Sequence, residues 1–426
     1  MHSMNTLSIT DIVKTVDSPA EISAAAARMR RVISEEEISP SEVIARFDSW
    51  AKNLDARELD DLPGIAFLRM WLRRGTLEPI VSRELGSESA DGRWIQEGRA
   101  NLRAFPVGVV GHWPAGNVEI QPILSMTCAL LGGNAALVRI PSGLAELTRA
   151  LMDKLVQSDT DGRLIRRIFM VSFKHERQDL QAAMAQAVDG AMIWGGKEAV
   201  LQIRALPFPH WTRLAVFGPR ISVAAMDANA WTNPEEQQTW CLRLARDVWQ
   251  FDQQACSSPQ VLFLEKRPGS SVVPFLSCLQ RAFENENRAH PRRMIPAVLT
   301  STICGARASW LLENAEHRAV FPAGPDWTLL LGSGSDIPEP VQGKTLTVLE
   351  VDDLRDAVSK WDGNVQTLGL GMGDAEKEKE LAVLAGKRGV DRVVKLGRMH
   401  VFVSPWDGVD LIRPMVRIVR HVSSTE

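Results

Sequence analysis

The sequence contains no tyrosine, no CxxC pair and no HExxH segment. Without tyrosine, no phenol is available as an acid, and any proton donor has to be another group. Because closely spaced cysteine or histidine pairs hold most structural and catalytic zinc ions, the two missing motifs argue against a zinc site. We therefore expect a protein without a bound metal.

Strong charge and long apolar runs are also lacking. The formal net charge is −3 over 426 residues, which gives no basic field for nucleic acid. No apolar run reaches the roughly 18 residues that a transmembrane helix needs. The N-terminal segment MHSMNTLSITDIVK lacks the charged and apolar regions of a signal peptide, and five irregularly spaced cysteines do not form a disulfide framework. These features, with 45% hydrophobic and 24% charged residues, are typical of a cytoplasmic enzyme of two or three domains.

The pattern of apolar runs divides the chain into four parts. Residues 1–93 are predicted to be a helical N-terminal region. Residues 94–227 alternate short apolar strands with helices, which is typical of a parallel sheet of the dinucleotide-binding, Rossmann type. Residues 228–405 continue as a second α/β domain, and residues 406–426 end in a strand that returns to a sheet or to a subunit interface. Within these parts, one strand is expected at 104–111 and a strand pair or bent strand at 215–227.

Cys256 is the cysteine whose surroundings point to chemistry. It lies between a predicted helix at 234–250 and a predicted strand at 260–264, in the polar segment FDQQACSSPQ. Such a junction can hold a thiol both rigidly and within reach of a substrate, which a nucleophile requires. The other four cysteines lie in apolar or helical stretches, and we expect them in the core: Cys128, Cys241, Cys278 and Cys304. The alternative for Cys256 is a buried, inert thiol.

Four segments occur in a fixed order along the chain: FPVGVVGHWPAGN, NAALVRIPSG, MIWGGKEAV and FDQQACSSPQ. Together with VFGPRIS, QTLGL and PWDG, they resemble the aldehyde dehydrogenase superfamily, and more closely its acyl-CoA reductase (LuxC) branch. The resemblance covers roughly residues 95–420. It implies an aldehyde dehydrogenase-like α/β fold in which a Rossmann-type cofactor domain accompanies a second domain that carries the catalytic cysteine.

The resemblance also implies roles for individual residues. Cys256 matches the nucleophile and Asn117 matches the side-chain donor to the oxyanion; the alternative for Asn117 is a plain turn residue. Gly195 and Gly196, followed by Lys197 at a helix start, suit the approach of a pyrophosphate, although a glycine pair also forms ordinary turns.

Two further residues, Arg139 and Ser142, match the contacts to the adenosine ribose. A ribose-binding Glu is missing after Ser142, and Arg139 lies nearby, which favours NADPH, with NADH as the alternative. Arg139 in a surface ion pair is the competing interpretation.

Two glutamates of the superfamily are missing from the matching segments. The base that activates water in acid-forming aldehyde dehydrogenases falls at Val216. A second Glu, which holds the nicotinamide ribose, is replaced in the segment 341–344, with Glu339 only nearby. Without the first Glu, water should attack an acyl-enzyme slowly.

We therefore expect an oxidoreductase that reduces an acyl thioester, fatty acyl by resemblance, to the aldehyde through an acyl-enzyme on Cys256. The alternatives are a non-redox cysteine acyltransferase, an acid-forming aldehyde dehydrogenase and a scaffold with a vestigial site. The expected partners are acyl-CoA or an acyl-carrier or acyl-protein thioester, an acyl-protein synthetase, and further copies of the chain in a dimer or tetramer. His112, His400, His421 and Asp252 are expected to be structural rather than catalytic.

Overall fold

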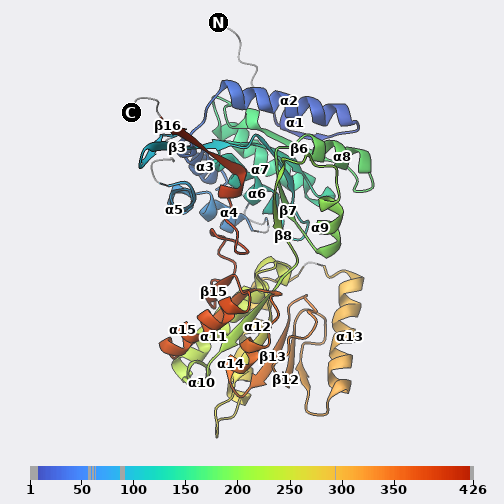
Figure 1. Ribbon diagram of the computed structural model, residues 1–426. Coiled ribbons are helices and arrows are strands. Elements are labelled where there is room, and N and C mark those ends of the chain that lie inside the picture. Colours follow the sequence, from blue (N-terminus) through green and yellow to red (C-terminus); the bar gives the residue numbers. More distant parts are fainter. Residues whose placement is uncertain are drawn as a thin grey trace. The chain divides into compact units, whose positions relative to one another are not determined.

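The computed structural model describes residues 8–55, 59, 62, 64–86, 92–292 and 294–422 (Figure 1). The chain forms two compact units. Unit 1 combines Met1–Pro219 with Val403–Glu426, and unit 2 is Arg220–Phe402. Each unit is built on its own, largely parallel sheet.

The sheet of unit 1 has six strands in the order β1-β6-β5-β4-β7-β8, and all neighbouring pairs are parallel. The elements of unit 1 are α1 (Ile9–Ile12), β1 (Val13–Thr15), α2 (Pro19–Glu35), α3 (Pro40–Asn53), α4 (Ile65–Trp71), α5 (Arg74–Leu85), β2 (Ile95–Glu97), β3 (Ala100–Pro106), β4 (Val109–Trp113), α6 (Gln121–Leu131), β5 (Ala135–Arg139), η3 (Ser142–Leu144), α7 (Ala145–Ser158), η4 (Ile165–Arg167), β6 (Ile168–Ser172), α8 (Gln178–Gln186), β7 (Gly190–Trp194), α9 (Lys197–Arg204), β8 (Arg213–Phe217), η6 (Arg413–Met415) and β16 (Val416–Val422).

Both faces of this sheet are covered by helices, which explains the near-continuous apolar strands. Every residue of β4 and β7 is buried. Residues of α2, α8 and α9 share one core with alternate residues of β4, β5, β6 and β7. From β4 the chain proceeds through β5 to β6 on one side, and β7 and β8 lie on the other. The order therefore reverses between β4 and β7, and ligands of such sheets bind outside the carboxyl ends of the strands at this reversal.

The predicted helical N-terminal region is not a separate domain but packs on the six-stranded sheet of unit 1. Its helices are present, but β1 pairs in parallel with β6 and extends the sheet at its edge. Ser39 is the N-cap of α3, since its side chain accepts a hydrogen bond from the Glu42 backbone N–H. The predicted boundary at 93/94 separates parts that form one unit, because the N-terminal helices cover sheet faces that would otherwise be exposed to water.

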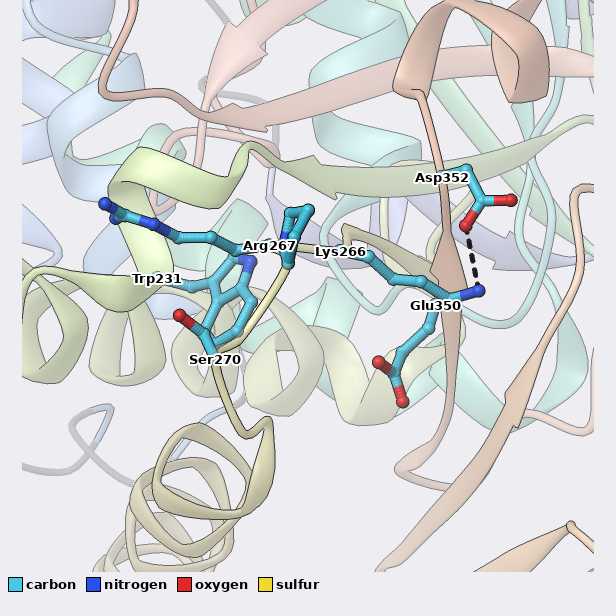
Figure 2. Close-up of a pocket in the computed structure, with 7 residues that line it drawn as sticks. Trp231, Lys266, Arg267, Ser270, Glu350 and Asp352 are labelled. Atoms are coloured by element: carbon cyan, nitrogen blue, oxygen red, sulfur yellow. Dashed lines mark hydrogen bonds and ion pairs between the residues drawn. The ribbon is translucent and has the colours of Figure 1, made fainter.

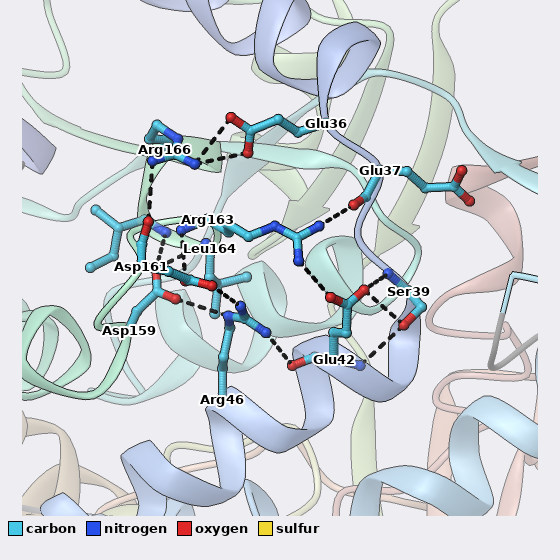
Figure 3. A network of polar contacts seen from close by, with 11 residues as sticks. Glu36, Glu37, Ser39, Glu42, Arg46, Asp159, Asp161, Arg163, Leu164 and Arg166 are labelled. Atoms are coloured by element: carbon cyan, nitrogen blue, oxygen red, sulfur yellow. Dashed lines mark hydrogen bonds and ion pairs between the residues drawn. The ribbon is translucent and has the colours of Figure 1, made fainter. Parts of the chain in front are cut away.

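A network of ion pairs joins the N-terminal helices to the segment between α7 and β6 (Figure 3). Arg46 of α3 bonds Asp159 at 2.9 Å and Asp161 at 2.5 Å, and Arg166 makes two bonds to the Glu36 carboxylate, at 2.8 and 3.0 Å. Asp159 also accepts from the backbone N–H groups of two residues in this segment, at 2.9 and 2.8 Å. Because the Asp159 side chain is fully buried, these bonds replace the water that it loses on folding.

A second, small sheet and one buried carboxylate hold the C-terminal segment of unit 1. β16 pairs antiparallel with β3, which also pairs with β2, so the end of the chain returns to a sheet. Glu84, near the end of α5, is only 4% exposed. Its carboxylate accepts the backbone N–H groups of Leu411, Ile412 and Arg413 at 3.0, 2.6 and 2.8 Å, and also the Ser404 hydroxyl.

Unit 2 contains a seven-stranded sheet in the order β11-β12-β13-β10-β9-β14-β15, in which β11 alone is antiparallel to its neighbour. Alternate residues of β9 and β10 enter two different cores, one on the side of α10, α11 and α12 and the other on the side of α14 and α15. The elements of unit 2 are β9 (Ile221–Met226), α10 (Ala228–Thr232), α11 (Pro234–Trp249), η5 (Gln250–Gln253), β10 (Pro259–Glu265), α12 (Val273–Ala289), α13 (Ala297–Glu313), β11 (Arg318–Val320), β12 (Thr328–Ser333), β13 (Thr345–Val351), α14 (Leu354–Ser359), β14 (Val365–Gly371), α15 (Ala375–Lys387) and β15 (Arg392–Lys395).

Four details differ from the sequence prediction. The single strand expected at 104–111 is two strands, β3 and β4, in different sheets. The strand pair expected at 215–227 is present, but β8 belongs to unit 1 and β9 to unit 2, so the boundary is at 219/220 rather than 227/228. The chain returns to unit 1 at 403 rather than at 406, because residues 404–413 bond to Glu84. Cys304, expected in the core, is exposed on α13, since that helix buries only Ile303 and Arg307.

Replacing Glu84 by alanine should destabilise unit 1, because three backbone N–H groups near residue 412 would lose their acceptor inside the protein. We expect the free energy of unfolding to fall by about 2–4 kcal/mol, the usual cost of such buried unsatisfied groups. Urea unfolding followed by circular dichroism measures the change. Glu78→Ala is the control, since Glu78 lies on the same helix but is half exposed and, among the described residues, pairs with Arg74 alone; equal effects of the two substitutions would contradict the role of Glu84.

Candidate functional site

The predicted cofactor residues and Asn117 lie at the carboxyl edge of the sheet in unit 1. Asn117 follows β4 after four residues, Arg139 is the last residue of β5, and Gly195 follows β7. Because β5, β4 and β7 are adjacent parallel strands, these positions share one edge of the sheet, next to the reversal between β4 and β7. The fold thus brings to one edge residues that lie up to 78 positions apart in the sequence, from Asn117 to Gly195.

The turn after β7 has the backbone that the glycine pair permits. Gly195 has a φ of +157°, and a Cβ there would lie 3.3 Å from the Ala199 side chain. Gly196 is the N-cap of α9, Lys197 is its first residue and is exposed, and a Cβ on Gly196 would meet no atom within 4 Å. The first N–H groups of a helix attract anions, so this turn can accept a phosphate group.

Arg139 and Ser142 lie at the end of β5 and just beyond it. The Arg139 guanidinium is 5.3 Å above the Phe173 ring, and burial lowers the pKa of Arg139. Its Nε atom is buried and has no hydrogen-bond partner in the part of the chain that the structure describes. Ser142 is exposed at the start of η3. A partly buried cation three residues before an exposed hydroxyl can bind an anionic ligand at this edge of the sheet.

His112 is structural, as expected. It is fully buried on β4, its Nδ1 lies 2.7 Å from the Ser125 hydroxyl of α6, and the Trp194 indole N–H donates to the same hydroxyl at 2.9 Å. Burial lowers the pKa of His112 to about 3, so the ring is neutral at ordinary pH. These bonds join α6 to the end of β7, where Trp194 stacks on Phe217 at 3.7 Å.

In unit 2, Cys256 occupies a short turn just before β10, at the amino edge of the sheet. The thiol residue is partly exposed, whereas Ala255, Ser257 and Ser258 are buried. The Ser258 N–H donates to the Ala255 carbonyl at 2.9 Å and closes the turn. From β9, the Ser222 hydroxyl donates to the Cys256 carbonyl at 2.7 Å. These hydrogen bonds fix the backbone at Cys256, and its thiol is not buried in an apolar core.

The three residues at the end of η5 have left-handed backbone conformations, which are uncommon for residues other than glycine. Phe251, Asp252 and Gln253 have φ values of 53°, 54° and 62°. The fully buried Gln253 side chain donates to the carbonyls of Pro259 and Thr345, at 2.9 and 2.8 Å, and accepts the Thr345 N–H at 2.8 Å. These three bonds bind the loop to β10 and β13, and they stabilise a conformation that costs about 1–3 kcal/mol per residue when unsupported.

Asp252 is engaged with two cations. Its carboxylate lies 2.6 Å from Arg292 Nε and 3.4 Å from Lys344 Nζ, and Lys344 also lies 4.7 Å above the Trp249 ring. Lys344 is 3% exposed, and burial lowers its pKa despite the nearby carboxylate. These contacts agree with the structural role expected for Asp252. They also show that the segment that lacks the second superfamily Glu carries a buried lysine.

His400 is also buried and contacts the Cys256 turn directly. Its Nδ1 is 2.9 Å from the Ser257 hydroxyl, and its Nε2 is 2.7 Å from the backbone carbonyl of Asp247 in α11. Burial lowers the pKa of His400 to about 4. The Asp247 carboxylate accepts the Gly397 N–H at 2.5 Å and so holds the loop that carries His400.

Sequence reasoning missed Ser222, Gln253 and Asp247 as supports of the Cys256 turn. Ser222 precedes Cys256 by 34 residues and Asp247 lies on the predicted helix before it, and their residue types carry no distinctive signal. Gln253 belongs to the polar segment around Cys256, and the glutamine pair just before the cysteine is the one signal in the sequence that points to it. The predicted site residues themselves divide between the units, with Cys256 in unit 2 and all the others in unit 1.

One pocket in unit 2 lies away from Cys256 (Figure 2). It is lined by Trp231, Lys266, Arg267, Pro268, Ser270, Glu350 and Asp352, which surround the carboxyl ends of β10 and β13. Cys256 precedes the amino end of β10, and seven residues of strand span about 20 Å. Lys266 and Asp352 pair across this pocket at 2.9 Å. None of the predicted site residues lines it.

Within the described residues, no group of three or more His, Cys, Asp or Glu side chains is arranged to hold a metal ion. None of the helices in that same part of the chain has both the length and the apolar character to cross a membrane.

Comparison with known sequences connects this geometry to a family. A family model described as Acyl-CoA reductase (LuxC) matches residues 28–418. A long-chain acyl-protein thioester reductase of Aliivibrio fischeri is 23% identical over 360 residues, which are 82% of this chain and 71% of that protein. One of the same name from Photobacterium phosphoreum is 26% identical over 358 residues, covering 82% of this chain and 69% of the relative.

Solved structures show the same fold at low sequence identity. Glyceraldehyde-3-phosphate dehydrogenase GapN from Methanocaldococcus jannaschii, complexed with NADP, has a TM-score of 0.71 at 12% identity, covering 97% of this chain and 96% of that one. A Bradyrhizobium japonicum Proline Utilization A variant has a TM-score of 0.72 at 15% identity over 97% of this chain, which spans only 46% of it. Aldehyde dehydrogenase 21 from Physcomitrella patens has a TM-score of 0.70 at 13% identity and covers 96% and 91% of the two chains. The predicted aldehyde dehydrogenase-like fold is confirmed.

Asp247 should make the stability of unit 2 depend on pH. Burial raises the pKa of Asp247 to about 7, although the N–H groups of Gly397 and Met399 act against this. An unfolded carboxyl group titrates near pH 4, so between about pH 4 and pH 7 the folded state keeps a proton that the unfolded state has lost. The stability from this group is complete below about pH 4 and is lost as the pH rises to 7.

The Asp247→Asn variant cannot titrate at this position. We expect the stability difference, wild type minus variant, to fall by about 1.4 kcal/mol per pH unit across that window. Urea unfolding at pH 5, 6, 7 and 8 measures it, with Asp352→Asn as the control, because the Asp352 side chain is 88% exposed. A difference that does not change with pH would contradict the raised pKa.

Proposed function

The chain belongs to the acyl-CoA reductase (LuxC) family, and we propose that it reduces an acyl thioester to the aldehyde with a nicotinamide cofactor, through a covalent acyl-enzyme on Cys256. The observation that carries this proposal is the Cys256 turn: a partly exposed thiol on a backbone fixed by polar side chains, in an aldehyde dehydrogenase fold.

The first step uses the thiol of Cys256. The thiolate attacks the thioester carbonyl, a tetrahedral oxyanion forms, and its collapse expels the donor thiol and leaves the acyl group on Cys256. An ordinary thiol is only a few per cent ionised at pH 7, so the turn has to favour the thiolate. The closed turn and the Ser222 bond supply a rigid, hydrogen-bonded backbone next to the sulfur.

The oxyanion requires donors that are already in place, and a single such donor lowers a barrier by about 3 kcal/mol. We propose the Asn117 side-chain amide and the Cys256 backbone N–H for this role. Asn117 is exposed at the carboxyl edge of the sheet in unit 1, where a donor can reach a bound substrate.

The second step converts the acyl-enzyme to the aldehyde. A reduced nicotinamide, held by the residues named below, would supply the hydride for this reduction, and Cys256 would keep the acyl group in place until the aldehyde leaves and its thiol is restored. Water can compete with this reduction by accepting the acyl group, which would release a carboxylic acid instead of the aldehyde. Val216, a partly buried apolar residue of β8, stands where acid-forming relatives carry their water-activating Glu, so the acyl-enzyme should persist until reduction.

A nicotinamide cofactor is supported by the fold and by the GapN structure, which contains NADP. We propose NADPH, held by Gly195, Gly196 and Lys197 at its phosphates and by Arg139 and Ser142 at its ribose. Among the described residues Arg139 has no acidic partner and packs on the Phe173 ring, so its charge is available to a phosphate. NADH would offer that charge no 2′-phosphate.

The substrate and partners follow from the relatives. Several are named long-chain acyl-protein thioester reductases, so we propose a long-chain acyl group, delivered as an acyl-protein or acyl-CoA thioester. An acyl-protein synthetase is the corresponding proposed partner, and a dimer or tetramer is the proposed assembly. We place the reaction in the cytoplasm, where the thiol of Cys256 stays reduced.

Replacing Cys256 by alanine should abolish reduction, because no acyl-enzyme can form. Oxidation of NADPH on addition of acyl-CoA measures the rate, and mass spectrometry of wild-type protein incubated with acyl-CoA alone should find the acyl mass on Cys256. Cys304→Ser is the matched control, since Cys304 is also an accessible cysteine, and it should keep full activity. An active Cys256→Ala variant refutes the mechanism, and acyl exchange without NADPH oxidation in the wild type indicates an acyltransferase.

Replacing Arg139 by alanine should weaken the binding of NADPH more than the binding of NADH. Loss of a charge-assisted bond to phosphate, about 1.5–3 kcal/mol, predicts a KM for NADPH raised by about 10- to 100-fold, with little change for NADH. Arg149→Ala tests the effect of removing an exposed charge from the same unit. Equal losses with both cofactors would show that Arg139 does not contact a 2′-phosphate.

A further inference from the structure

We propose that His400 is a positioning residue for the reaction: it holds Ser257, the next residue after the nucleophile, and thereby fixes the direction of the Cys256 thiol. This inference rests on the proposed function in one respect, namely that Cys256 is the nucleophile. It assigns a role to a histidine that the mechanism above does not use.

The two hydrogen bonds of His400 determine its tautomer. Nε2 lies 2.7 Å from the backbone carbonyl oxygen of Asp247, which can only accept, so Nε2 carries the proton. The neutral ring then has a lone pair on Nδ1, and the Ser257 hydroxyl donates to it at 2.9 Å. Both ring nitrogens are therefore used, and the orientation of the imidazole is fixed at both ends.

Three separate segments meet at this imidazole. Asp247 belongs to the last turns of α11, His400 follows β15, and Ser257 lies in the turn before β10. The Asp247 carboxylate also accepts the Gly397 N–H at 2.5 Å, so one residue holds the histidine loop by its side chain and the ring by its backbone. The Phe251 ring lies edge-on to the imidazole, with the ring centroids 5.4 Å apart.

The nucleophile is thus anchored through two consecutive residues, Cys256 and Ser257, by side chains from two different segments. Ser222 of β9 binds the Cys256 carbonyl, and His400 binds the Ser257 side chain. Rotation of the peptide between these residues would break one of the two bonds. Since displacement of a reacting atom by about 1 Å can slow a reaction about 100-fold, such double anchoring acts directly on the rate.

Ser257 and His400 are not themselves a nucleophile and its base. The Ser257 residue is only 3% exposed, so its hydroxyl cannot reach a substrate carbonyl. The pKa of His400, lowered to about 4 by burial, makes the ring a weak base at neutral pH. The pair is therefore suited to holding the turn and not to acyl transfer.

Four variants test the role in a Cys304→Ser background, which removes the exposed thiol. Loss of one buried hydrogen bond predicts that His400→Ala and Ser257→Ala each slow the alkylation of Cys256 by iodoacetamide, and lower kcat, by about tenfold, with the KM for NADPH unchanged. His400→Asn keeps an acceptor near the Nδ1 position and should recover most of the rate. His400→Gln keeps the donor to Asp247 but not the acceptor for Ser257, and should resemble His400→Ala.

The double variant Ser257→Ala with His400→Ala separates positioning from general weakening of the structure. Because both substitutions remove the same bond, we expect the double variant to lose about tenfold and not about 100-fold. Additive losses, a His400→Ala variant that reacts at the wild-type rate, or equal rates for the asparagine and glutamine variants would each overturn the proposal.

The two readouts distinguish this proposal from the proposed function. Alkylation of Cys256, located by mass spectrometry of its peptide, requires neither acyl thioester nor NADPH. If the wild type reduces no thioester but the variants still alter alkylation as described, the proposed function fails and the positioning role stands. If His400→Ala does not fold, Ser257→Ala and the asparagine and glutamine pair decide the question, because each removes fewer buried atoms.

Discussion

Burial of both faces of a parallel sheet is the constraint on which each unit depends. In unit 1 every residue of β4 and β7 is buried, and in unit 2 alternate residues of β9 and β10 enter two separate cores. A sheet covered in this way exposes its backbone only at the strand ends. The polar residues of the candidate site are accordingly found at the carboxyl edge in unit 1 and at the amino edge in unit 2, where the turns leave the apolar layers.

The Cys256 turn shows how much buried polarity is needed to hold one reactive group. Ser222, Gln253, Ser257 and His400 are each buried or nearly so, and each bonds to the turn or to the loop before it. Buried polar groups stabilise a structure only when their hydrogen bonds are formed. This network therefore acts mainly by selecting one backbone conformation of the turn, and less by raising the free energy of unfolding. The left-handed residues 251–253 are stabilised by the same bonds.

Electrostatics enters the two units in different ways. Near Cys256, burial lowers the pKa of His400 to about 4, so the imidazole is neutral, and the turn is held by its hydrogen bonds to Ser222 and His400. In unit 1, Arg139 at the end of β5 and the N-terminus of α9 both favour a negative ligand. The chemistry expected of the family therefore divides between a rigidly held thiol in unit 2, which has to ionise to react, and an edge of the sheet in unit 1 that favours an anionic ligand.

The sequence by itself determined the class of the fold, most of its strands and helices, and the identity of the main site residues. Glycine pairs, apolar runs and the polar segment around Cys256 are local signals, and α11 and β10 lie where the sequence predicts a helix at 234–250 and a strand at 260–264. Only the tertiary structure decided that the segments 104–111 and 215–227 each divide between two sheets. It also decided that residues 1–93 belong to unit 1 and that Cys304 is exposed. The same holds for the contacts of Ser222, Asp247 and His400 with the Cys256 turn. The physical reason is that short-range patterns record which residues are apolar or can turn, whereas a hydrogen bond across 143 residues, as between Ser257 and His400, exists only after the strands have assembled.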